Sequence, residues 1–432
     1  MDKLITFLSL SDPNVRYVVI GSTLLMASSA VAGCFTFLRK RSLTGDAVAH
    51  AVLPGICLAF MLSGQKDPLM LLIGAFATGW LSLIAMDFIN GKTKLKEDTT
   101  TGLVLSVFFG IGVLLLTIIQ QSGAGNQSGL DTFLFGKAAA MKENDLLVFG
   151  TTGSLILLTV IVFFRELTIV SFDPNFARAI GMPIRLYELI LTTITVLAVV
   201  IGIQATGVVL MAAMLISPAA AARFWTHKLP VMILLAAIMG AFSGISGAYI
   251  SYVYPTMPTG PWIVVIISLI ALGSFLLAPG KGILARLSRQ RENRKKIMEE
   301  NVLKVFFHLG EPEKDFFKPR TQEDLLNKRD MDRSQLNSTL YRLKSDGYLK
   351  QEKNKWMLTN EGFGHGKRVT RLHRLWEMYL STYMNIAPDH VHDDAETMEH
   401  IITPELEQKL EQQLGFPLKD PHDSDIPYKG SF

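Results

Sequence analysis

A chain of 432 residues with 49% hydrophobic and only 19% charged residues is too apolar for an ordinary soluble protein of this size. The charge is divided unevenly, because residues 1–280 hold 16 basic and 13 acidic side chains while the shorter remainder holds 26 and 25. This division excludes a single soluble domain and predicts a membrane part followed by a water-soluble tail. Only Cys34 and Cys57 are cysteines, and both lie in apolar segments, which excludes a disulfide framework and a zinc–thiolate site.

Apolar runs follow one another along the first part, each long enough, or nearly so, to cross a bilayer as a helix. They lie near residues 17–38, 47–64, 68–90, 101–120, 145–164, 186–203, 205–222, 229–252 and 261–279. Lys and Arg gather after every second run, and short basic loops stay in the cytoplasm. We therefore expect about nine spans, an outside N-terminus and a cytoplasmic tail. Glycines within the runs, such as Gly240 and Gly244, favour close helix packing over a pore.

The second run opens with TGDAVAHAVLPG at 44–55, which places Asp46 and His50 four residues apart. In a helix these two side chains share a face, one turn apart. A carboxylate and an imidazole supply half of a site for a first-row transition metal, and an ionisable residue inside a span usually serves function. The alternative is that Asp46 caps the helix and His50 is a buried, hydrogen-bonded histidine.

A short amphipathic cytoplasmic helix is predicted in SFDPNFARAIGMPIR at 171–185. The signals are an Asp173-Pro174 cap and first turn, one face shared by Phe176, Ala177 and Ile180, and a stop at Gly181. Such a helix either lies on the membrane surface or inserts into a groove on a partner protein. Residues 130–144 form another candidate, as an interfacial or re-entrant helix.

Together these segments resemble the membrane permeases of ATP-binding-cassette importers for manganese, zinc and iron. The resemblance covers residues 1–280 and is carried by GDAVAHAVLPG at 45–55, LFG at 134–136, FDPNFARAIG at 172–181 and GVVLMAAMLISPAAAARF at 207–224. It implies an all-α polytopic permease of the bacterial cell membrane, a homodimer or paired permease with the pathway between subunits. It also implies an extracellular metal-binding lipoprotein that feeds the permease and a cytoplasmic ATP-binding-cassette ATPase that drives it.

In this resemblance Asp46 and His50 match the metal ligands of the pathway, and residues 172–184 match the coupling helix that docks on the ATPase. The coupling residues are Asp173, Pro174, Phe176, Ala177, Arg178, Ile180 and Gly181. The chain has no G-x-x-x-x-G-K-[ST] sequence, so we expect ATP hydrolysis on a separate chain and no enzymatic activity here.

Beyond a transmembrane domain at 1–280, residues 281–296 form a basic linker that predicts a helix leaving the bilayer along anionic headgroups. Helices are then expected at 297–309, 321–327 and 333–346, with a hairpin at 349–359. Thr321 and Asp324 have the spacing of a capping box. This order of elements is that of a winged helix-turn-helix, at 297–370.

The winged helix carries candidate DNA contacts at Arg333, Arg342 and Lys344 on its third helix and at Lys353 on the wing. Residues 281–374 hold 23 basic and 13 acidic side chains, a balance that suits a phosphate backbone. The alternative is a winged helix used only for protein contact, with its basic face toward acidic lipids.

Imidazole and carboxylate side chains recur after the hairpin, at His373, Glu377, His392, Glu396, Glu399 and His400. The first two lie one helical turn apart, and the last three fall at i, i+3 and i+4 and so share a face. Such ligands without cysteine suit manganese, iron or zinc. A charged, exposed helix of similar composition is the alternative.

Residues 297–427 are similar to the diphtheria-toxin-repressor class of metal-dependent transcriptional regulators. The similarity runs from the winged helix through RLHRLWEMYL at 371–380 to VHDDAETMEHIITPELEQKLEQQLGFPLKDPHDSDIP at 391–427. It implies that 371–432 binds metal and dimerises. One implied site consists of His373, Glu377 and His392; the other consists of Glu396, Glu399, His400 and, from the first helix, Glu300. A second first-helix acid, used by manganese-specific members, falls on Leu303, which cannot ligate.

We therefore expect a permease for a divalent transition metal, manganese first and zinc or iron next, fused to a cytoplasmic metal sensor that regulates transport. The metal ion is then both substrate and regulator. Two alternatives stay open: a membrane-anchored, metal-dependent regulator that binds DNA through its winged helix, and a tail that serves only dimerisation.

Overall fold

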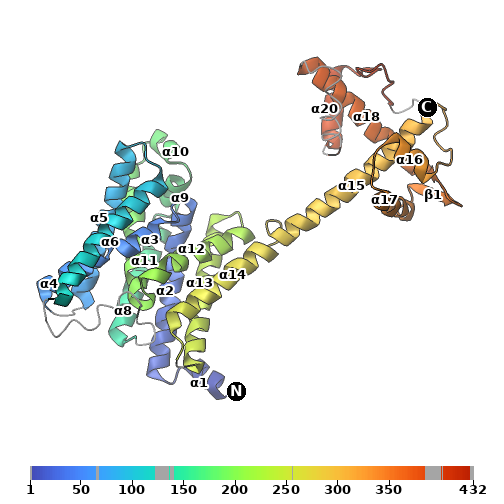
Figure 1. Cartoon of the computed structure of the whole chain (residues 1–432). Coiled ribbons are helices and arrows are strands. Elements are labelled where there is room, and N and C mark those ends of the chain that lie inside the picture. Colours follow the sequence, from blue (N-terminus) through green and yellow to red (C-terminus); the bar gives the residue numbers. More distant parts are fainter. Residues whose placement is uncertain are drawn as a thin grey trace. The chain divides into compact units, whose positions relative to one another are not determined.

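The computed structural model of the chain describes residues 2–64, 68–121, 136, 141–254, 256–384, 400 and 402–428. The chain divides into two compact units, Met1–Arg286 and Leu287–Phe432. The first unit is helical, and the second adds a two-stranded sheet to its helices (Figure 1). The predicted fold class, a polytopic helical membrane part followed by a winged helix and a helical domain, is confirmed.

The helices of the membrane unit follow the predicted apolar runs. They are α1 (Asp2–Ser9), α2 (Pro13–Leu38), α3 (Thr44–Ala51), α4 (Leu53–Ser63), α5 (Pro68–Lys92), α6 (Glu97–Gln121), α8 (Glu143–Val162), α9 (Phe164–Phe172), α10 (Pro174–Ala179), α11 (Ile184–Thr206), α12 (Val208–Trp225), α13 (Leu229–Val253) and α14 (Thr259–Leu277). Within the described residues, eight segments are long and apolar enough to span a membrane, with α3 and α4 counted as one. The shorter apolar helix α12 accounts for the remaining predicted run, at 205–222.

Helix α2 lies at the centre of this unit, where α8, α11, α12 and α13 pack against it (Figure 1). Two glycines of α13 allow the closest approach, because a Cβ atom at Gly240 would lie 2.7 Å from the carbonyl oxygen of Met26, and one at Gly244 would lie 2.8 Å from that of Ser22. Lipid gives helices no hydrophobic reason to associate, so close backbone packing stabilises the bundle instead. The predicted packing role of these glycines is confirmed.

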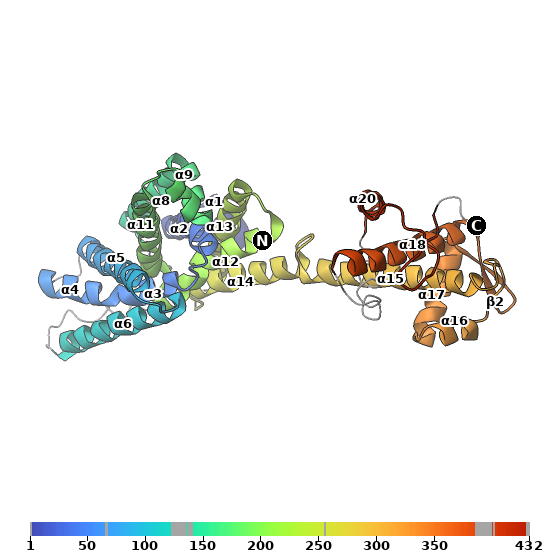
Figure 2. The ribbon, with the colours of Figure 1, turned by 90° about the horizontal axis from the view of Figure 1, so that it is seen from above.

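The second span is a broken helix. Helix α3 ends at Ala51, α4 begins at Leu53, and Val52 lies between them. Pro54, in the first turn of α4, has no N–H and cannot donate the helical hydrogen bond to the carbonyl of His50. Helices α5, α6, α11 and α12 all pack against α3 (Figure 2). The break therefore leaves a short polar-faced helix held by four neighbours.

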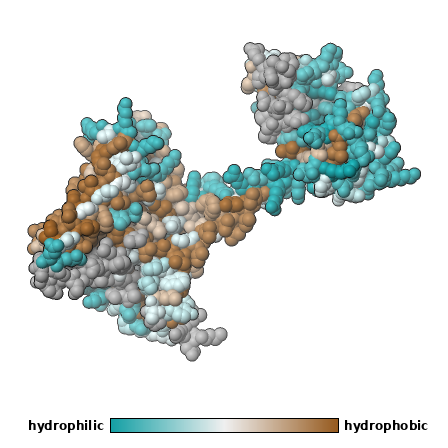
Figure 3. Space-filling view, in the orientation of Figure 1, coloured by the Kyte–Doolittle hydropathy of each residue, from teal (hydrophilic) through white to brown (hydrophobic). Residues whose placement is uncertain are grey.

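Large apolar side chains cover the outside of the membrane unit. Examples are Leu81, Phe88, Leu114, Leu158 and Ile161, which are all at least half exposed. In Figure 3 the hydrophobic colour covers much of the visible face of the membrane unit. On a chain with eight apolar spans, such a surface is the one that faces lipid. The chain is therefore a multi-pass membrane protein.

The second unit follows from helix α15 (Ile283–Gly310), which begins in the first. Its other elements are α16 (Gln322–Lys328), α17 (Arg333–Ser345), β1 (Leu349–Glu352), β2 (Lys355–Leu358), α18 (Asn360–Tyr383) and α20 (Pro404–Leu414). The strands pair antiparallel, with Leu349 opposite Leu358 and Glu352 opposite Lys355. The basic linker and the first helix of the winged helix are thus one continuous helix.

The winged helix forms around an apolar core that includes Val302, Phe306, Leu336, Leu340 and Trp356. Its second helix starts as predicted. The N–H of Thr321 donates to Oδ2 of Asp324 at 2.7 Å, and the N–H of Asp324 donates to Oγ1 of Thr321 at 3.3 Å. This reciprocal cap satisfies two of the N–H groups that a helix start leaves unpaired.

Candidate metal sites and contact surfaces

Asp46 and His50 lie one turn apart on α3, with Nε2 of His50 3.7 Å from Oδ1 of Asp46. Their side chains are 40% and 24% exposed, whereas six of the eight residues of α3 are buried. Leu43 is the N-cap of α3 and no side chain caps the helix, so the capping role considered for Asp46 is wrong. Nδ1 of His50 is buried and has no hydrogen-bond partner in the described part of the chain, so a satisfied core histidine is not observed either.

The neighbours of α3 leave one side of it open. The edge of the His50 ring meets Phe109 of α6, with ring centroids 5.1 Å apart at 87°. On the opposite flank a Cβ atom at Gly45 would lie 2.9 Å from the side chain of Leu215, so α3 and α12 are in close contact. Sequence reasoning missed Phe109, because no local pattern connects it to His50.

The Asp46–His50 pair supplies one hard oxygen and one imidazole donor, a combination that manganese, iron and zinc all accept. Two side chains are half of the usual ligand set for such a cation. Among the residues that the structure describes, no group of three or more His, Cys, Asp or Glu side chains gathers as a metal site. Within the described residues, this partly exposed pair therefore offers two of the donors that such a cation takes.

Helix α10 forms where the sequence predicts it. The N–H of Phe176 donates to Oδ1 of Asp173 at 2.9 Å, Pro174 occupies the first turn, and Gly181 follows the helix with a φ of +77°. Ala177 is buried, whereas Phe176 and Ile180 are 52% and 51% exposed. The expectation that these three side chains share one face is wrong, because Ala177 anchors α10 and the other two project outward. In Figure 1, α10 lies at the opposite end of the membrane unit from α1.

The first predicted metal pair of the tail lies buried on α18. Nε2 of His373 is 3.0 Å from Oε1 of Glu377, and the two side chains are 4% and 3% exposed. The third predicted ligand, His392, lies outside the described residues. A carboxylate buried to this degree needs a compensating partner, and the imidazole of His373 lies within hydrogen-bond distance of it.

The second predicted metal pair joins two distant segments, since Nδ1 of His400 lies 2.5 Å from Oε2 of Glu300. Nζ of Lys296 is 3.8 Å from the other oxygen of that carboxylate. Leu303, the position of the missing acid, is buried in the winged-helix core. The predicted ligands Glu396 and Glu399 lie outside the described residues.

The candidate DNA contacts on α17 all have polar partners. Arg333 lies 2.9 Å from Glu323, Arg342 lies 2.8 Å from Glu299, and Nζ of Lys344 donates to Gln351 at 2.9 Å. Lys353 lies at the tip of the hairpin with a φ of +55°. The exposed face of α17 carries Ser334, Asn337, Ser338 and Tyr341, uncharged side chains that a search for basic residues does not find.

A buried ion-pair cluster, also missed in the sequence, surrounds Arg374 beside His373. Nη1 of Arg374 lies 2.7 Å from Oε1 of Glu311, and Nε of Arg374 lies 3.5 Å from Oδ2 of Asp420. These contacts connect α18 to the turn after α15 and to the C-terminal segment. Helix α18 is thereby fixed to the winged helix within the second unit.

Comparison with known proteins gives two matches to protein families. Residues 11–278 match the ABC 3 transport family, and residues 359–428 match the iron dependent repressor, metal binding and dimerisation domain. These matches fall on the membrane unit and on the part of the tail that carries His373 and Glu377.

Individual relatives agree with these matches. The chain is 41% identical over 382 residues to the manganese transport system membrane protein MntC of Bacillus subtilis, covering 88% of this chain and 87% of that protein. It is 43% identical over 281 residues to the zinc transport system membrane protein TroC of Treponema pallidum, covering 65% and 94%. A similar solved structure is PsaBC from Streptococcus pneumoniae in complex with Fab, with a TM-score of 0.57, 33% identity and coverage of 64% of this chain and 97% of that one.

Proposed function

The chain belongs to the ABC 3 transport family of membrane permeases, and we propose that it imports manganese, with zinc or iron as alternative substrates, through a pathway lined by Asp46 and His50. The observation that carries this proposal is the acid–imidazole pair on the partly open face of α3. We take manganese as the first candidate substrate because the relative that matches this chain over 382 residues is a manganese transport protein. The chain is a transport subunit and not an enzyme.

Two copies of the chain, or this chain with a second permease, would form the pathway. Each copy offers one carboxylate and one imidazole, whose Oδ1 and Nε2 atoms are 3.7 Å apart. A symmetric pair therefore offers two carboxylates and two imidazoles to one cation. The open side of α3 then faces the partner instead of lipid. An extracellular metal-binding lipoprotein would deliver the cation to this pair from the outer side.

A separate cytoplasmic ATPase would drive transport through α10. Phe176 and Ile180 are the exposed apolar side chains that fit a groove on that partner. Asp173 and Pro174 shape the start of the helix and Gly181 its end. Of the remaining residues, Ala177 is buried against the bundle, and Nη1 of Arg178 donates to Oδ1 of Asn175 within α10 at 3.4 Å.

The tail would bind the same class of metal as a sensor. His373, Glu377 and His392 would form one site, and Glu300, Glu396, Glu399 and His400 the other. The described pairs fit a metal ion, because each joins an imidazole to a carboxylate within 3.0 Å and no thiolate is involved. Metal at the second site would hold α15 against the segment at His400, and we propose that this state slows transport when cytoplasmic metal is high.

DNA binding is a second candidate function of the tail. The observation that favours it is the exposed polar face of α17, whose hydroxyl and amide groups are of the kind that contact base edges and phosphates. Arg333, Lys344 and Lys353 would meet phosphates around it, while Arg342 faces Glu299. Specific binding of promoter DNA by the tail with saturating manganese should then weaken steeply with salt, and an absence of any shift would contradict this function.

Metal analysis of the purified full chain tests the pathway site. We expect Asp46→Ala to lose the pathway metal and to keep the metal held by the tail. Asp98→Ala, an exposed carboxylate on the neighbouring helix α6, is the control and should match the wild type. An unchanged metal content in Asp46→Ala would contradict the proposed site.

ATPase docking is tested by Phe176→Ala. Loss of one buried aromatic anchor from an interface commonly costs about 2 kcal/mol, so ATP-driven manganese uptake should fall by up to about 30-fold while metal content stays the same. Leu147→Ala, an exposed apolar residue on α8 far from α10, is the control. Equal uptake in all three chains would remove α10 as the docking element.

A further inference from the structure

The corner between α2 and α3 is a hydrogen-bonded turn that fixes the position of Arg41. The N–H of Arg41 donates to the carbonyl of Thr36 at 3.1 Å, and the N–H of Lys40 donates to that of Phe37 at 3.0 Å. Lys40 has a φ of +61°, a left-handed conformation that usually requires glycine at this place in a helix ending. A lysine that adopts it gives the chain a sharp corner immediately before α3.

Arg41 uses both sides of its guanidinium group to hold two other helices. Its Nη1 lies 2.9 Å from Oδ1 of Asp87 near the end of α5, and its Nε lies 2.6 Å from Oε1 of Glu97, the first residue of α6. The carbonyl of Arg41 accepts a hydrogen bond from the N–H of Thr44 at 3.2 Å, which starts α3. One side chain therefore joins the beginning of α3 to the adjacent ends of α5 and α6.

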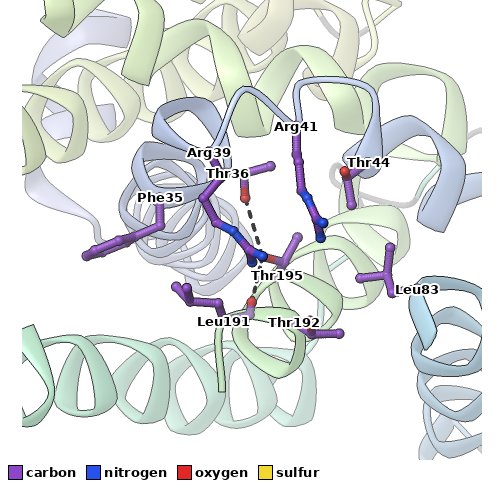
Figure 4. A pocket seen from close by; sticks show the side chains of 9 residues that line it. All are labelled: Phe35, Thr36, Arg39, Arg41, Thr44, Leu83, Leu191, Thr192 and Thr195. Atoms are coloured by element: carbon purple, nitrogen blue, oxygen red, sulfur yellow. Dashed lines mark hydrogen bonds between the residues drawn. The ribbon is translucent and has the colours of Figure 1, made fainter. Parts of the chain in front are cut away.

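Two further contacts hold the same corner against α11. The hydroxyl groups of Thr36 and Thr195 lie 3.3 Å apart, and Nη2 of Arg39 is 3.8 Å from Oε1 of Glu188. Figure 4 shows the small pocket at this corner, with the side chains of Arg39 and Arg41 directed into it. Its polar lining consists of these two guanidinium groups and the hydroxyl groups of threonines, and three carboxylates hold the guanidinium groups from outside the pocket.

The corner lies between the proposed metal site and the cytoplasm. Asp46 is five residues beyond Arg41 on the helix that the corner starts. Alternation of the spans puts the end of α2, the end of α5 and the start of α6 on the same side as α10 and the end of α14. Release of a cation from Asp46 toward that side therefore takes place at the end of the bundle where Arg41 holds α3 to α5 and α6.

From this geometry we propose that Arg41, held by Asp87 and Glu97, is the cytoplasmic gating residue of the permease. This inference rests on the proposed transport of metal through Asp46 and His50. While both ion pairs are formed, α3 stays closed against α5 and α6. Opening toward the cytoplasm separates Arg41 from one or both carboxylates.

The test measures manganese entry into proteoliposomes that contain the full chain, alone and with its ATPase. Without ATP, Arg41→Ala should raise downhill Mn²⁺ entry several-fold above the wild type, and with ATP it should lower the Mn²⁺ transported per ATP hydrolysed. Arg185→Ala, an exposed arginine at the start of α11, is the matched control and should leave both quantities unchanged.

A second variant keeps the arginine and removes its partners. Asp87→Asn combined with Glu97→Gln should raise the leak to a similar level, and adding Arg41→Ala to it should raise the leak no further, because all three act through one contact. Arg41→Lys, which keeps the charge but not the two-sided geometry, should lie between.

Each outcome separates the gate from the transport function. ATP-driven uptake in the wild type with no extra leak in Arg41→Ala or in the Asp87–Glu97 variant would overturn the gate. A strictly additive leak in the triple variant would also overturn it. A wild type that accumulates no Mn²⁺ with ATP would instead refute the proposed function, and the gate with it.

Discussion

Burial controls the charge of individual side chains in the tail, and His308 on α15 is the plainest case. Burial first, and then the positive charges of Lys304 and Arg374, lower the pKa of His308 from 6.5 to about 3. The folded chain therefore keeps this imidazole neutral over the range in which an unfolded histidine takes up a proton.

His308 should make the tail less stable in acid. Below pH 6.5 the unfolded chain binds a proton at this site and the folded chain does not, so the free energy of unfolding falls as the pH drops toward 3. In urea unfolding of residues 287–432 with a chelator, His308→Leu should lose less stability between pH 7.5 and 5 than the wild type does. His422→Leu, at an exposed position, is the control. Parallel pH profiles for the wild type and His308→Leu would contradict this assignment.

For single residues, the sequence predicts which side chains are neighbours within one helix. It does not predict which side chains from distant segments come into contact. Asp46 and His50 are predictable because a spacing of four places them on one face. Glu300 and His400 are brought together only by the fold of the second unit, and resemblance to a family was needed to pair them. The contacts of Arg41 with Asp87 and Glu97 follow no local rule, because three separate helix ends must meet to form them.

Single helices were predictable where start and stop signals are strong. Asp173 and Thr321 cap α10 and α16 as expected, since a side-chain oxygen at the N-cap has one dominant role. The break between α3 and α4 and the unbroken course of α15 were not predicted. The segment from Ile283 to Leu309 contains no glycine or proline, so nothing in it ends the basic helix before the winged helix begins.

The contact between α4 and α5 depends on two facing glycines. A Cβ atom at Gly55 would fall on the carbonyl oxygen of Gly74, so Gly55→Ala must push the two helices apart. We expect a loss of about 1–3 kcal/mol in the free energy of unfolding, the usual cost of overpacking. Thermal unfolding in detergent measures it, and Gly102→Ala on α6, where nothing lies within 4 Å, is the control. Equal melting temperatures for the two variants would show that the helices do not pack this closely.

The whole chain joins a permease to a domain of the metal-dependent repressor type, and in the proposed function the transported metal also acts on the transporter. The membrane unit and the tail are separate compact units connected through α15, whose residue Glu300 meets His400. Metal at the proposed second tail site would therefore act on α15, the helix that connects the tail to the membrane unit. The division into a membrane part and a charged tail followed from composition, but the placement of ligands within the tail did not.

Loss of the sensor should relieve inhibition by internal metal. In vesicles loaded with Mn²⁺, we expect His400→Ala to take up metal several-fold faster than the wild type. In empty vesicles, the two proteins should take up metal at the same rate. His422→Ala, at an exposed histidine outside the proposed sites, should behave as the wild type. Equal rates for wild type and His400→Ala in loaded vesicles would remove the inhibitory role of the tail.

The most direct test of the pathway is ATP-driven Mn²⁺ uptake by the wild type, Asp46→Asn and His50→Gln, substitutions that keep side-chain size and remove one donor each. Changes even in the outer shell of a metal site cost about tenfold or more in affinity, so each variant should transport at least about tenfold less Mn²⁺ at limiting concentration. Glu143→Gln, an exposed carboxylate at the outer end of α8, should transport normally. Wild-type uptake by Asp46→Asn and His50→Gln would contradict the proposal that these two residues carry the metal across the membrane.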